Sequence, residues 1–145
     1  MSEKEVRVLV RRFLEESNNG KAAAMAVIDE LYATDIVQHG SGEDMRGLKD
    51  YKQSFSEAYN AFPDAHWSID DMVVEGDKVA VRLTFSGTHK GEYMGIHPTN
   101  KKVTGWGIFI DRIAGGKVVE EWQIFDMLGL MRQLGLPVPT PKKEK

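Results

Sequence analysis

The first part of the chain carries apolar residues at helical spacing. Ser2 and Glu5 form a capping box, in which each side chain can satisfy a free backbone N–H of the first turn. The apolar stripe that follows recurs every three or four positions and consists of Val6, Leu9, Val10, Phe13 and Leu14. Gly20 follows two asparagines, and these residue types accept the left-handed conformation that ends a helix. We therefore expect one helix before Gly20 and a second over residues 21–32.

A third helix is predicted after a short extended segment and a loop. Residues 36–39 begin with the apolar pair Ile36-Val37, and the glycine-rich residues 40–47 follow them. Helical spacing then returns in Leu48, Tyr51, Phe55, Ala58, Tyr59 and Phe62. Pro63 cannot continue a helix, because it lacks the backbone N–H, so the third helix ends there.

From Trp67 the period of the pattern changes to two, which is typical of strands. Apolar and polar residues alternate over residues 67–74, 79–86, 103–112 and 118–125, with glycine-containing turns at 75–78 and 114–117. A long loop over residues 87–102 separates the second and third of these strands. Residues 127–134 form a short final helix, and the prolines and lysines of residues 137–145 are typical of a disordered tail.

This order of elements predicts an α+β fold with a cone shape. N-terminal helices precede a meander of long antiparallel strands, and a strongly curved sheet must cover its concave face with those helices. We expect a single domain over residues 1–136. The inner faces of the strands are mostly apolar, so a pocket at the wide end would suit a small organic molecule.

Composition narrows the function classes. The chain has 145 residues, 41% of them hydrophobic, and a net charge of −3, which does not favour nucleic-acid binding. It contains no cysteine, and its four histidines lack the spacing of a metal site, so we expect neither a disulfide nor a metal. No apolar run is long enough to cross a bilayer, and no signal peptide is evident, so a cytoplasmic protein without a membrane partner is expected.

Four motifs, in order, resemble one protein family. They are His39; Phe62-Pro63-Asp64; the loop Gly87–Lys101 with the sequence GTHKGEYMGIHPTNK; and the C-terminal residues GKVVEEW at 116–122, Asp126, Gly129-Leu130 and Gln133-Leu134-Gly135. Together they resemble the SnoaL-like polyketide and ester cyclases. The resemblance implies the cone-shaped fold of the nuclear transport factor 2-like superfamily, with dimers formed through the outer face of the sheet. It also implies intramolecular aldol ring closure without metal or organic cofactor.

The resemblance assigns the acid/base role to Asp126, at the end of the last strand. A buried carboxyl group among apolar neighbours can have a pKa near neutrality and can then both accept and donate a proton. The alternative interpretation is that Asp126 caps the final helix. Gln123 and Glu121 would face inward instead if a bulge shifts the strand by one residue, although Glu121 is expected to be solvated.

The other candidate site residues also have two interpretations each. His39 could donate a hydrogen bond to a substrate carbonyl, or could be satisfied by the backbone at a corner of the fold. His89 could line the mouth of the pocket or could fix the long loop. Arg82 could bind an anionic group, or could pair with a neighbour such as Asp111. The aromatic residues expected in the core or the pocket wall include Trp106, Trp122, Tyr51 and Phe55.

Two hypotheses for the function remain open at this point. The first is an enzyme of the cyclase, isomerase or hydratase-like lyase type that acts on a small organic substrate. The second is a module of the same fold that binds a small ligand, or pairs as a scaffold, without chemistry. A pocket carboxyl group with a raised pKa would favour the enzyme.

Overall fold

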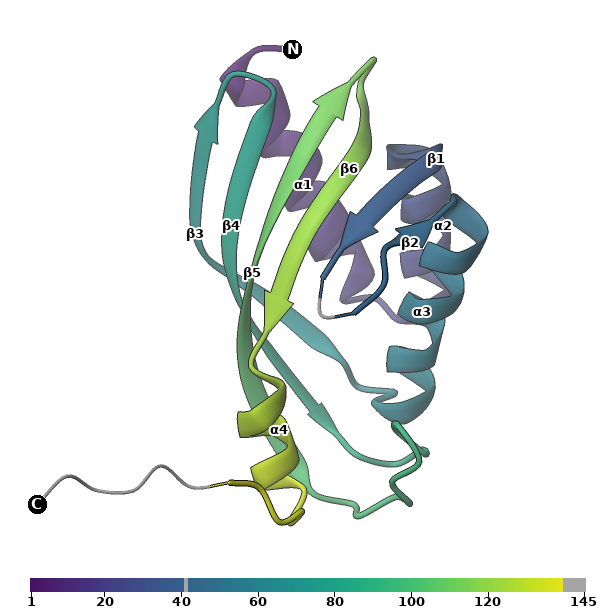
Figure 1. The fold of residues 1–145 in the computed structure, drawn as a ribbon. Coiled ribbons are helices and arrows are strands. Elements are labelled where there is room, and N and C mark those ends of the chain that lie inside the picture. The colour runs from purple at the N-terminus through teal and green to yellow at the C-terminus, as the bar shows by residue number, and fades with distance from the viewer. Residues whose placement is uncertain (41, 140–145) are drawn as a thin grey trace, which may run out of the picture.

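The computed structural model describes residues 1–40 and 42–139 of the chain (Figure 1). The helices are α1 Glu3–Ser17, α2 Lys21–Leu31, α3 Leu48–Ala61 and α4 Met127–Gln133. The strands are β1 Tyr32–His39, β2 Met45–Arg46, β3 His66–Glu75, β4 Lys78–Thr88, β5 Lys102–Ala114 and β6 Lys117–Phe125. The predicted order, in which helices precede long strands, is confirmed.

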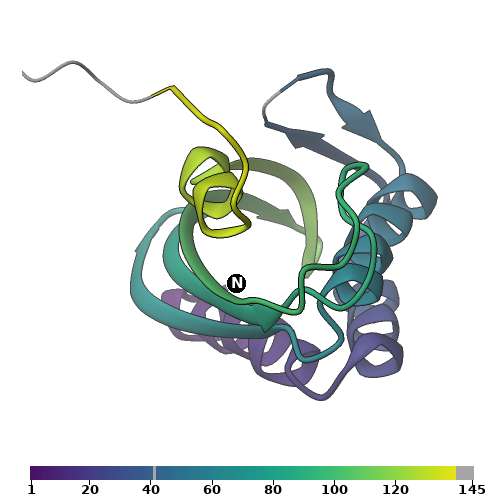
Figure 2. The same ribbon diagram turned by 90° about the horizontal axis from the view of Figure 1, so that it is seen from below.

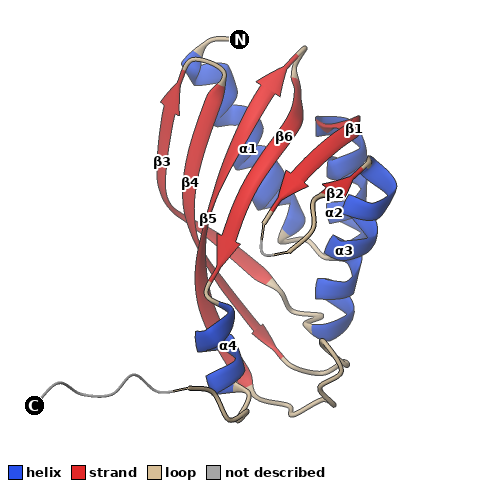
Figure 3. Cartoon of the chain, viewed as in Figure 1, coloured by secondary structure: helices blue, strands red, loops and turns tan. Residues whose placement is uncertain are grey.

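The strands form one curved sheet in the order β2-β1-β6-β5-β4-β3 (Figure 3). Strands β3 to β6 are the predicted antiparallel meander, but β1 lies parallel to β6. The expectation of a purely antiparallel sheet is therefore corrected to a mixed one. Tyr32, predicted to end the second helix, instead begins β1, where it pairs with Val118 of β6, a partner far away in the sequence. The extended segment predicted over residues 36–39 is therefore longer and starts at residue 32. The sheet is not closed, since β2 and β3 are its two edges. The predicted cone-shaped α+β fold is confirmed.

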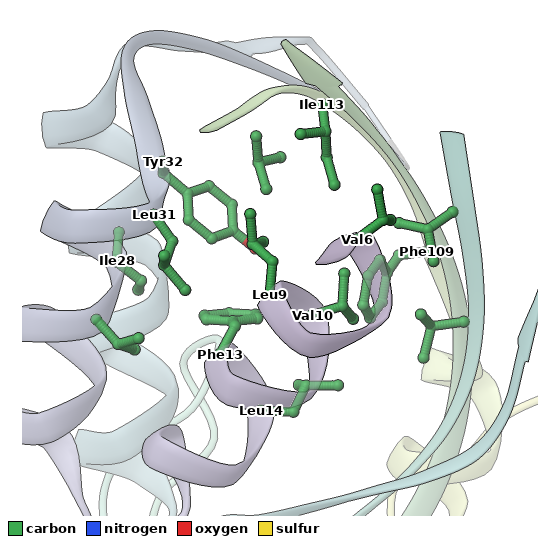
Figure 4. Close-up of a cluster of buried hydrophobic side chains, with 14 of the residues drawn as sticks. Val6, Leu9, Val10, Phe13, Leu14, Ile28, Leu31, Tyr32, Phe109 and Ile113 are labelled. Atoms are coloured by element: carbon green, nitrogen blue, oxygen red, sulfur yellow. The ribbon is translucent and has the colours of Figure 1, made fainter. Parts of the chain in front are cut away.

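The three longer helices cover the concave face of the sheet (Figures 1 and 2). The predicted capping box of α1 is present, because Ser2 Oγ accepts from Glu5 N at 3.1 Å and Glu5 Oε1 accepts from Ser2 N at 3.3 Å. The apolar stripe of α1 packs against Tyr32 of β1 and against Phe109 and Ile113 of β5 (Figure 4). A second buried cluster around Phe62, Phe85, Leu130 and Leu134 joins α3 and α4 to the sheet.

Strand β3 contains a bulge that the sequence pattern did not reveal. Its register with β4 shifts between Ile69 and Asp71, so one additional residue lies in β3. Trp67 and Ile69 pack on the core before the bulge, whereas Met72 and Val74 do so after it. The expected unbroken alternation over residues 67–74 is therefore wrong.

Two glycines on the inner face of β5 leave room for an aromatic ring. A Cβ atom at Gly105 would lie 2.7 Å from Cζ of Phe125, and one at Gly107 would lie 2.8 Å from the backbone oxygen of Ile124. Because these contacts are too short for real Cβ atoms, only glycine lets Phe125 lie across the strand at this point. The sheet thereby keeps an apolar wall at the end where α4 packs.

The predictions about membrane spans and about the C-terminal tail can be compared with the described residues. No helix within residues 1–40 and 42–139 is long and apolar enough to cross a bilayer. The disordered tail predicted over residues 137–145 falls mostly outside the described residues, which end at residue 139.

Candidate active site

The cone encloses a cavity of about 570 Å³. It is bordered by α1, α3, β4, β5, β6, α4 and the loop after β4, and Figure 2 shows α4 and this loop at the same end of the molecule. Most of its wall is apolar or aromatic, including Phe13, Leu14, Phe55, Phe62, Trp67, Leu83, Phe85, Phe109, Phe125, Met127 and Leu130. A cavity of this size and character suits a small organic molecule of moderate polarity.

Glu121 is the buried carboxyl group in the wall of this cavity. It lies on β6 and is only 4% exposed. Its Oε1 accepts from Nε2 of Gln38 at 2.7 Å and from the hydroxyl group of Tyr51 at 3.2 Å. The hydroxyl group of Tyr32 donates to Oε2 at 3.4 Å. Neutral donors from two separate elements, β1 and α3, therefore hold this carboxylate in place.

Asp111 lies directly beside Glu121. The two residues are opposite each other in the β5–β6 register, and Asp111 is only 1% exposed. Burial raises the pKa of Asp111 well above its ordinary value, and the charge and hydrogen bonding of Glu121 raise it further. Burial likewise raises the pKa of the Tyr51 hydroxyl group, followed by the negative charge of Glu121. Burial thus favours the protonated forms of Asp111 and Tyr51, the two groups beside Glu121.

The mouth of the cavity carries further polar side chains. Ser54 and Glu57 of α3 and Glu92 of the loop after β4 are exposed and line it, together with the exposed Met94. Gln123 also lines the cavity, on the same face of β6 as Glu121. Within the described residues, the lining contains no Lys, Arg or His side chain. The cavity therefore combines apolar walls with negative charge and neutral hydrogen-bonding groups.

His89 fixes the loop at the mouth. The side chain is fully buried, and its Nδ1 accepts from the backbone N of Thr99 at 3.1 Å. Its backbone pairs with Lys101 and Asn100, so the two ends of the loop are joined. Of the two interpretations of His89, the structure supports loop fixation, because His89 is not in the cavity lining.

Asp126 has a capping geometry. It is the N-cap of α4, and its Oδ1 accepts from the backbone N of Gly129 at 3.0 Å. It is exposed and lies outside the cavity lining. The expectation that Asp126 faces the interior is therefore wrong, because β6 turns Glu121, Gln123 and Phe125 inward and ends before it. The acid/base role carried to Asp126 by motif position has no support in this geometry.

His39 and Trp122 lie together, outside the cavity lining. The rings stack at a centroid distance of 5.4 Å. The two ring nitrogens of His39 lie 2.8 Å from Asp44 Oδ1 and 2.7 Å from Glu120 Oε2. The hydrogen bond to Glu120 is the largest cause that raises the pKa of His39, and the hydrogen bond to Asp44 is the next. His39 thus joins β1 to β6 and the 40–47 loop, and the expected contact with a substrate carbonyl is not formed from this position.

Arg82 and Trp106 lie on the outer face of the sheet. Arg82 is exposed and pairs with Asp71 at 2.9 Å and with Asp70 at 3.6 Å, not with Asp111, which faces the interior. Trp106 is 50% exposed and faces away from the cavity. The predicted binding roles of Arg82, Trp106 and Trp122 in the pocket are therefore not supported.

The sequence pattern found part of this site. Tyr51 and Phe55 line the cavity as expected. Gln123 lines it as well, although it was predicted to face inward only after a bulge, and the β5–β6 register is regular around it. The expectation of a solvated Glu121 is wrong. The importance of Asp111 was missed. A signal for it exists in the sequence, because Phe109, Asp111 and Ile113 alternate on one face of a strand and a carboxyl group there interrupts an apolar row.

The residues do not form an obvious metal site. Among the residues that the structure describes, no group of three or more His, Asp or Glu side chains is arranged to hold a metal ion. The site is therefore described by its carboxyl pair, its neutral hydrogen-bond donors and its apolar walls.

Comparison with known proteins agrees with this architecture. A model of the SnoaL-like polyketide cyclase family matches residues 8–134. The chain belongs to the SnoaL-like polyketide cyclase family. The aklanonic acid methyl ester cyclase of Streptomyces peucetius is 31% identical over 92% of this chain and 93% of its own length. The nogalonic acid methyl ester cyclase of Streptomyces nogalater is 34% identical over 44% of this chain and 48% of its own length.

Solved structures of similar proteins share the fold of this SnoaL-like protein. The structure of AclR from Streptomyces galilaeus, a candidate hydroxylase, superposes with a TM-score of 0.84 at 30% identity, covering 94% of this chain and 100% of AclR. TsrD from Streptomyces laurentii superposes with a TM-score of 0.83 at 29% identity, covering 93% of this chain and 98% of TsrD. The fold is therefore shared with solved structures that are 29–30% identical to this chain.

Proposed function

We propose that this SnoaL-like protein closes a ring in a small, largely apolar organic substrate by acid/base catalysis, without a metal or organic cofactor. Glu121 is the proposed proton-transferring group. The observation that carries the proposal is a buried carboxyl group in the wall of an apolar cavity, held by neutral donors. The names of the curated relatives, which are methyl ester cyclases, support the reaction class.

The proposed reaction is an intramolecular aldol addition. The Glu121 carboxylate removes a proton from a carbon next to a carbonyl group and gives an enolate. The enolate carbon attacks a second carbonyl carbon of the same substrate, which forms a carbon–carbon bond and leaves an alkoxide. The alkoxide takes the proton back from the Glu121 carboxyl group. Atoms and charge balance without a co-reactant, and the enzyme returns to its starting state.

Two neutral donors would stabilise negative charge during the reaction, one on the substrate and one on Glu121. The Gln123 amide lines the cavity two positions beyond Glu121 and can donate to an enolate oxygen. The Tyr51 hydroxyl group donates to Glu121 at 3.2 Å. This hydrogen bond stabilises the Glu121 carboxylate before it takes the proton and after it returns the proton. Asp126 and His39 are not part of this mechanism, because neither lines the cavity.

A purely ligand-binding role is the competing hypothesis, and the carboxyl pair argues against it. Burying Asp111 beside Glu121 costs free energy, because both polar groups lose solvation and the charged form of Asp111 is disfavoured there. A module that only binds an apolar ligand gains nothing from that cost, whereas an acid/base catalyst needs a carboxyl group held in its cavity.

Replacing Glu121 by glutamine tests the role of this group. Glu121→Gln keeps the size and a hydrogen-bonding oxygen but removes the base. We expect kcat/KM for ring closure to fall by about 10²–10⁴-fold, measured with aklanonic acid methyl ester and nogalonic acid methyl ester as substrates. Circular dichroism and urea unfolding would show that the variant is folded.

Glu57→Gln is the matched control, since Glu57 is an exposed carboxylate at the mouth of the same cavity. We expect its kcat/KM to stay within about threefold of the wild type. Wild-type activity in a folded Glu121→Gln variant would refute the proposed role of Glu121. An equal loss of kcat/KM in both variants would show that the reaction needs negative charge in the cavity and does not need Glu121 as a base.

We also propose that the protein is a homodimer that buries the outer face of its sheet. Trp106, Ile108 and Ile110 of β5 and Ile124 of β6 are exposed on this face, Ile124 to 64%. Exposed apolar side chains grouped on one sheet face are typical of protein interfaces. A second copy is the proposed occupant because the same face on both subunits can form a two-fold interface.

Sedimentation velocity would test the dimer. We expect the wild type to sediment as a dimer, and Ile124→Glu to shift it to a monomer, because an isologous interface would place two unpaired carboxylates within it. Val8→Glu, at an exposed apolar position on α1, is the control and should leave the dimer intact. A monomeric wild type would contradict the proposal.

A further inference from the structure

Asp111 and Glu121 form a buried pair without a neutralising cation. Asp111 of β5 and Glu121 of β6 are directly opposite each other, and both side chains are buried. The titratable groups that face Asp111 are Glu121, Tyr32 of β1 and Tyr51 of α3. From β4 its register partner is Val79, and the buried face of α1 is apolar apart from Ser17. No ion pair joins either carboxyl group to a Lys, Arg or His side chain in the described part of the chain.

Such a pair favours one shared proton, because two adjacent negative charges with little solvation repel strongly. The hydrogen bonds indicate which residue holds the proton. Glu121 accepts from Gln38, Tyr51 and Tyr32, and donors of this kind stabilise the charged form of a carboxyl group. Oδ1 of Asp111 is buried and has no hydrogen-bond partner. The hydrogen-bond pattern therefore favours Asp111 as the member of the pair that holds the proton.

We propose that Asp111 is a positioning residue that keeps one proton against Glu121, so that Glu121 remains a carboxylate directed at the cavity. Asp111 is not in the cavity lining and acts through Glu121. The inference rests on the proposed function of Glu121 for its catalytic consequence. The location of the proton on Asp111 does not depend on any activity. The proposed proton location and the proposed catalytic role of Glu121 can therefore be refuted separately.

Asp111→Asn is the decisive variant because it resembles a permanently protonated aspartic acid. We expect the acid limb of its kcat/KM–pH profile to lie at the same pH as in the wild type. Asp111→Ala removes the group that contacts Glu121, and its kcat/KM should fall by more than about tenfold. If Asp111 is instead charged in the wild type, Asp111→Asn would move the acid limb to lower pH, which would overturn the proposal.

The pH dependence of stability tests whether folded Asp111 is protonated, independently of catalysis. A folded Asp111 that keeps its proton loses stability relative to the unfolded chain as the pH rises above the ordinary value of 3.8 towards its raised pKa. We therefore expect the wild-type urea midpoint to fall over this range more steeply than that of Asp111→Asn. Equal slopes would overturn the proposal whether or not Glu121 proves catalytic. Should Asp111→Asn not fold, the infrared carbonyl band of a protonated carboxylic acid in the wild type at neutral pH decides the same point, and its absence would refute the proposal.

Discussion

Glu120 and Glu121 are neighbours in the chain, yet they have opposite surroundings. Successive side chains of a strand point to opposite faces, so β6 directs Glu120 outward and Glu121 inward. His39 and Arg112 bind Glu120, and the hydrogen bond from His39 is the largest cause that lowers its pKa. Glu121 receives only neutral donors beside a second carboxyl group. The same side chain is thus a structural ion-pair partner at one position and a candidate base at the next.

Asp126 offers a test at the same scale, because capping and catalysis respond differently to substitution. Asparagine caps helices as well as aspartate does, whereas alanine cannot accept the bond from Gly129 N. We expect Asp126→Ala to lower the free energy of unfolding by about 1 kcal/mol, measured by urea denaturation, and Asp126→Asn to leave it nearly unchanged. Both variants should retain ring-closing activity.

A contrasting result would restore the role that motif position gave to Asp126. If Asp126→Asn were as stable as the wild type but inactive, the carboxyl group itself would be needed for the chemistry. Glu121→Gln serves as the comparison, since the proposed mechanism predicts the loss of activity there.

At the scale of elements, the loop after β4 forms one side of the cavity mouth through a close backbone approach. The backbone N–H groups of Lys90 and Gly91 donate to the oxygen of Ala61 at the end of α3. A Cβ atom at Gly91 would lie 2.1 Å from the backbone oxygen of Asn60. The loop can therefore dock on α3 only with glycine at this position. Tyr93 then packs its ring 5.3 Å from that of Phe62, beside the cavity.

Gly91→Ala should displace this loop from α3. Because the neighbouring atom belongs to the backbone and cannot rotate away, we expect a loss of about 1–3 kcal/mol in the free energy of unfolding, measured by urea denaturation. The affinity for an apolar ligand should fall as well, since the loop carries Tyr93 and Met94 of the cavity wall.

Gly40→Ala is a suitable control for this prediction. A Cβ atom at Gly40 would lie 3.4 Å from the nearest atom, which is close to an ordinary contact. We expect a change in stability below about 0.5 kcal/mol there. An equally stable Gly91→Ala variant would mean that the loop moves freely relative to α3.

The negative charge of the whole cavity affects which ligands can bind in it. Glu57, Glu92 and Glu121 line it, and the lining within the described residues contains no cationic side chain. A free carboxylate would lose solvation on entering and would meet like charges, whereas a neutral ester would not.

We therefore expect a neutral methyl ester ligand to bind at least about tenfold more tightly than the corresponding free carboxylic acid at neutral pH. A tenfold difference in the dissociation constant corresponds to only about 1.4 kcal/mol of binding free energy. Isothermal titration calorimetry would measure both dissociation constants. The combined Glu57→Gln and Glu92→Gln variant should narrow the difference by improving binding of the acid. Equal affinity of the acid and the ester in the wild type would contradict this prediction.

Local sequence rules determined much of the molecule. The capping box of α1, its apolar stripe and the glycine turns between β3 and β4 and between β5 and β6 depend on residues close together in the chain, so pattern alone predicts them. The family motifs also led to the correct fold class. Such features need no knowledge of distant partners.

Only the tertiary structure decided which face of each strand looks into the cavity. Residues 122–125 of β6 are apolar or aromatic on both faces apart from Gln123, so alternation could not distinguish inside from outside. The pairing of Phe109 with Gln123 and of Asp111 with Glu121 fixed the choice, and these partners are far apart in the sequence. The parallel pairing of β1 with β6 and the bulge in β3 arise in the same way. The carboxyl pair exists because two distant strands share one register, which no local pattern encodes.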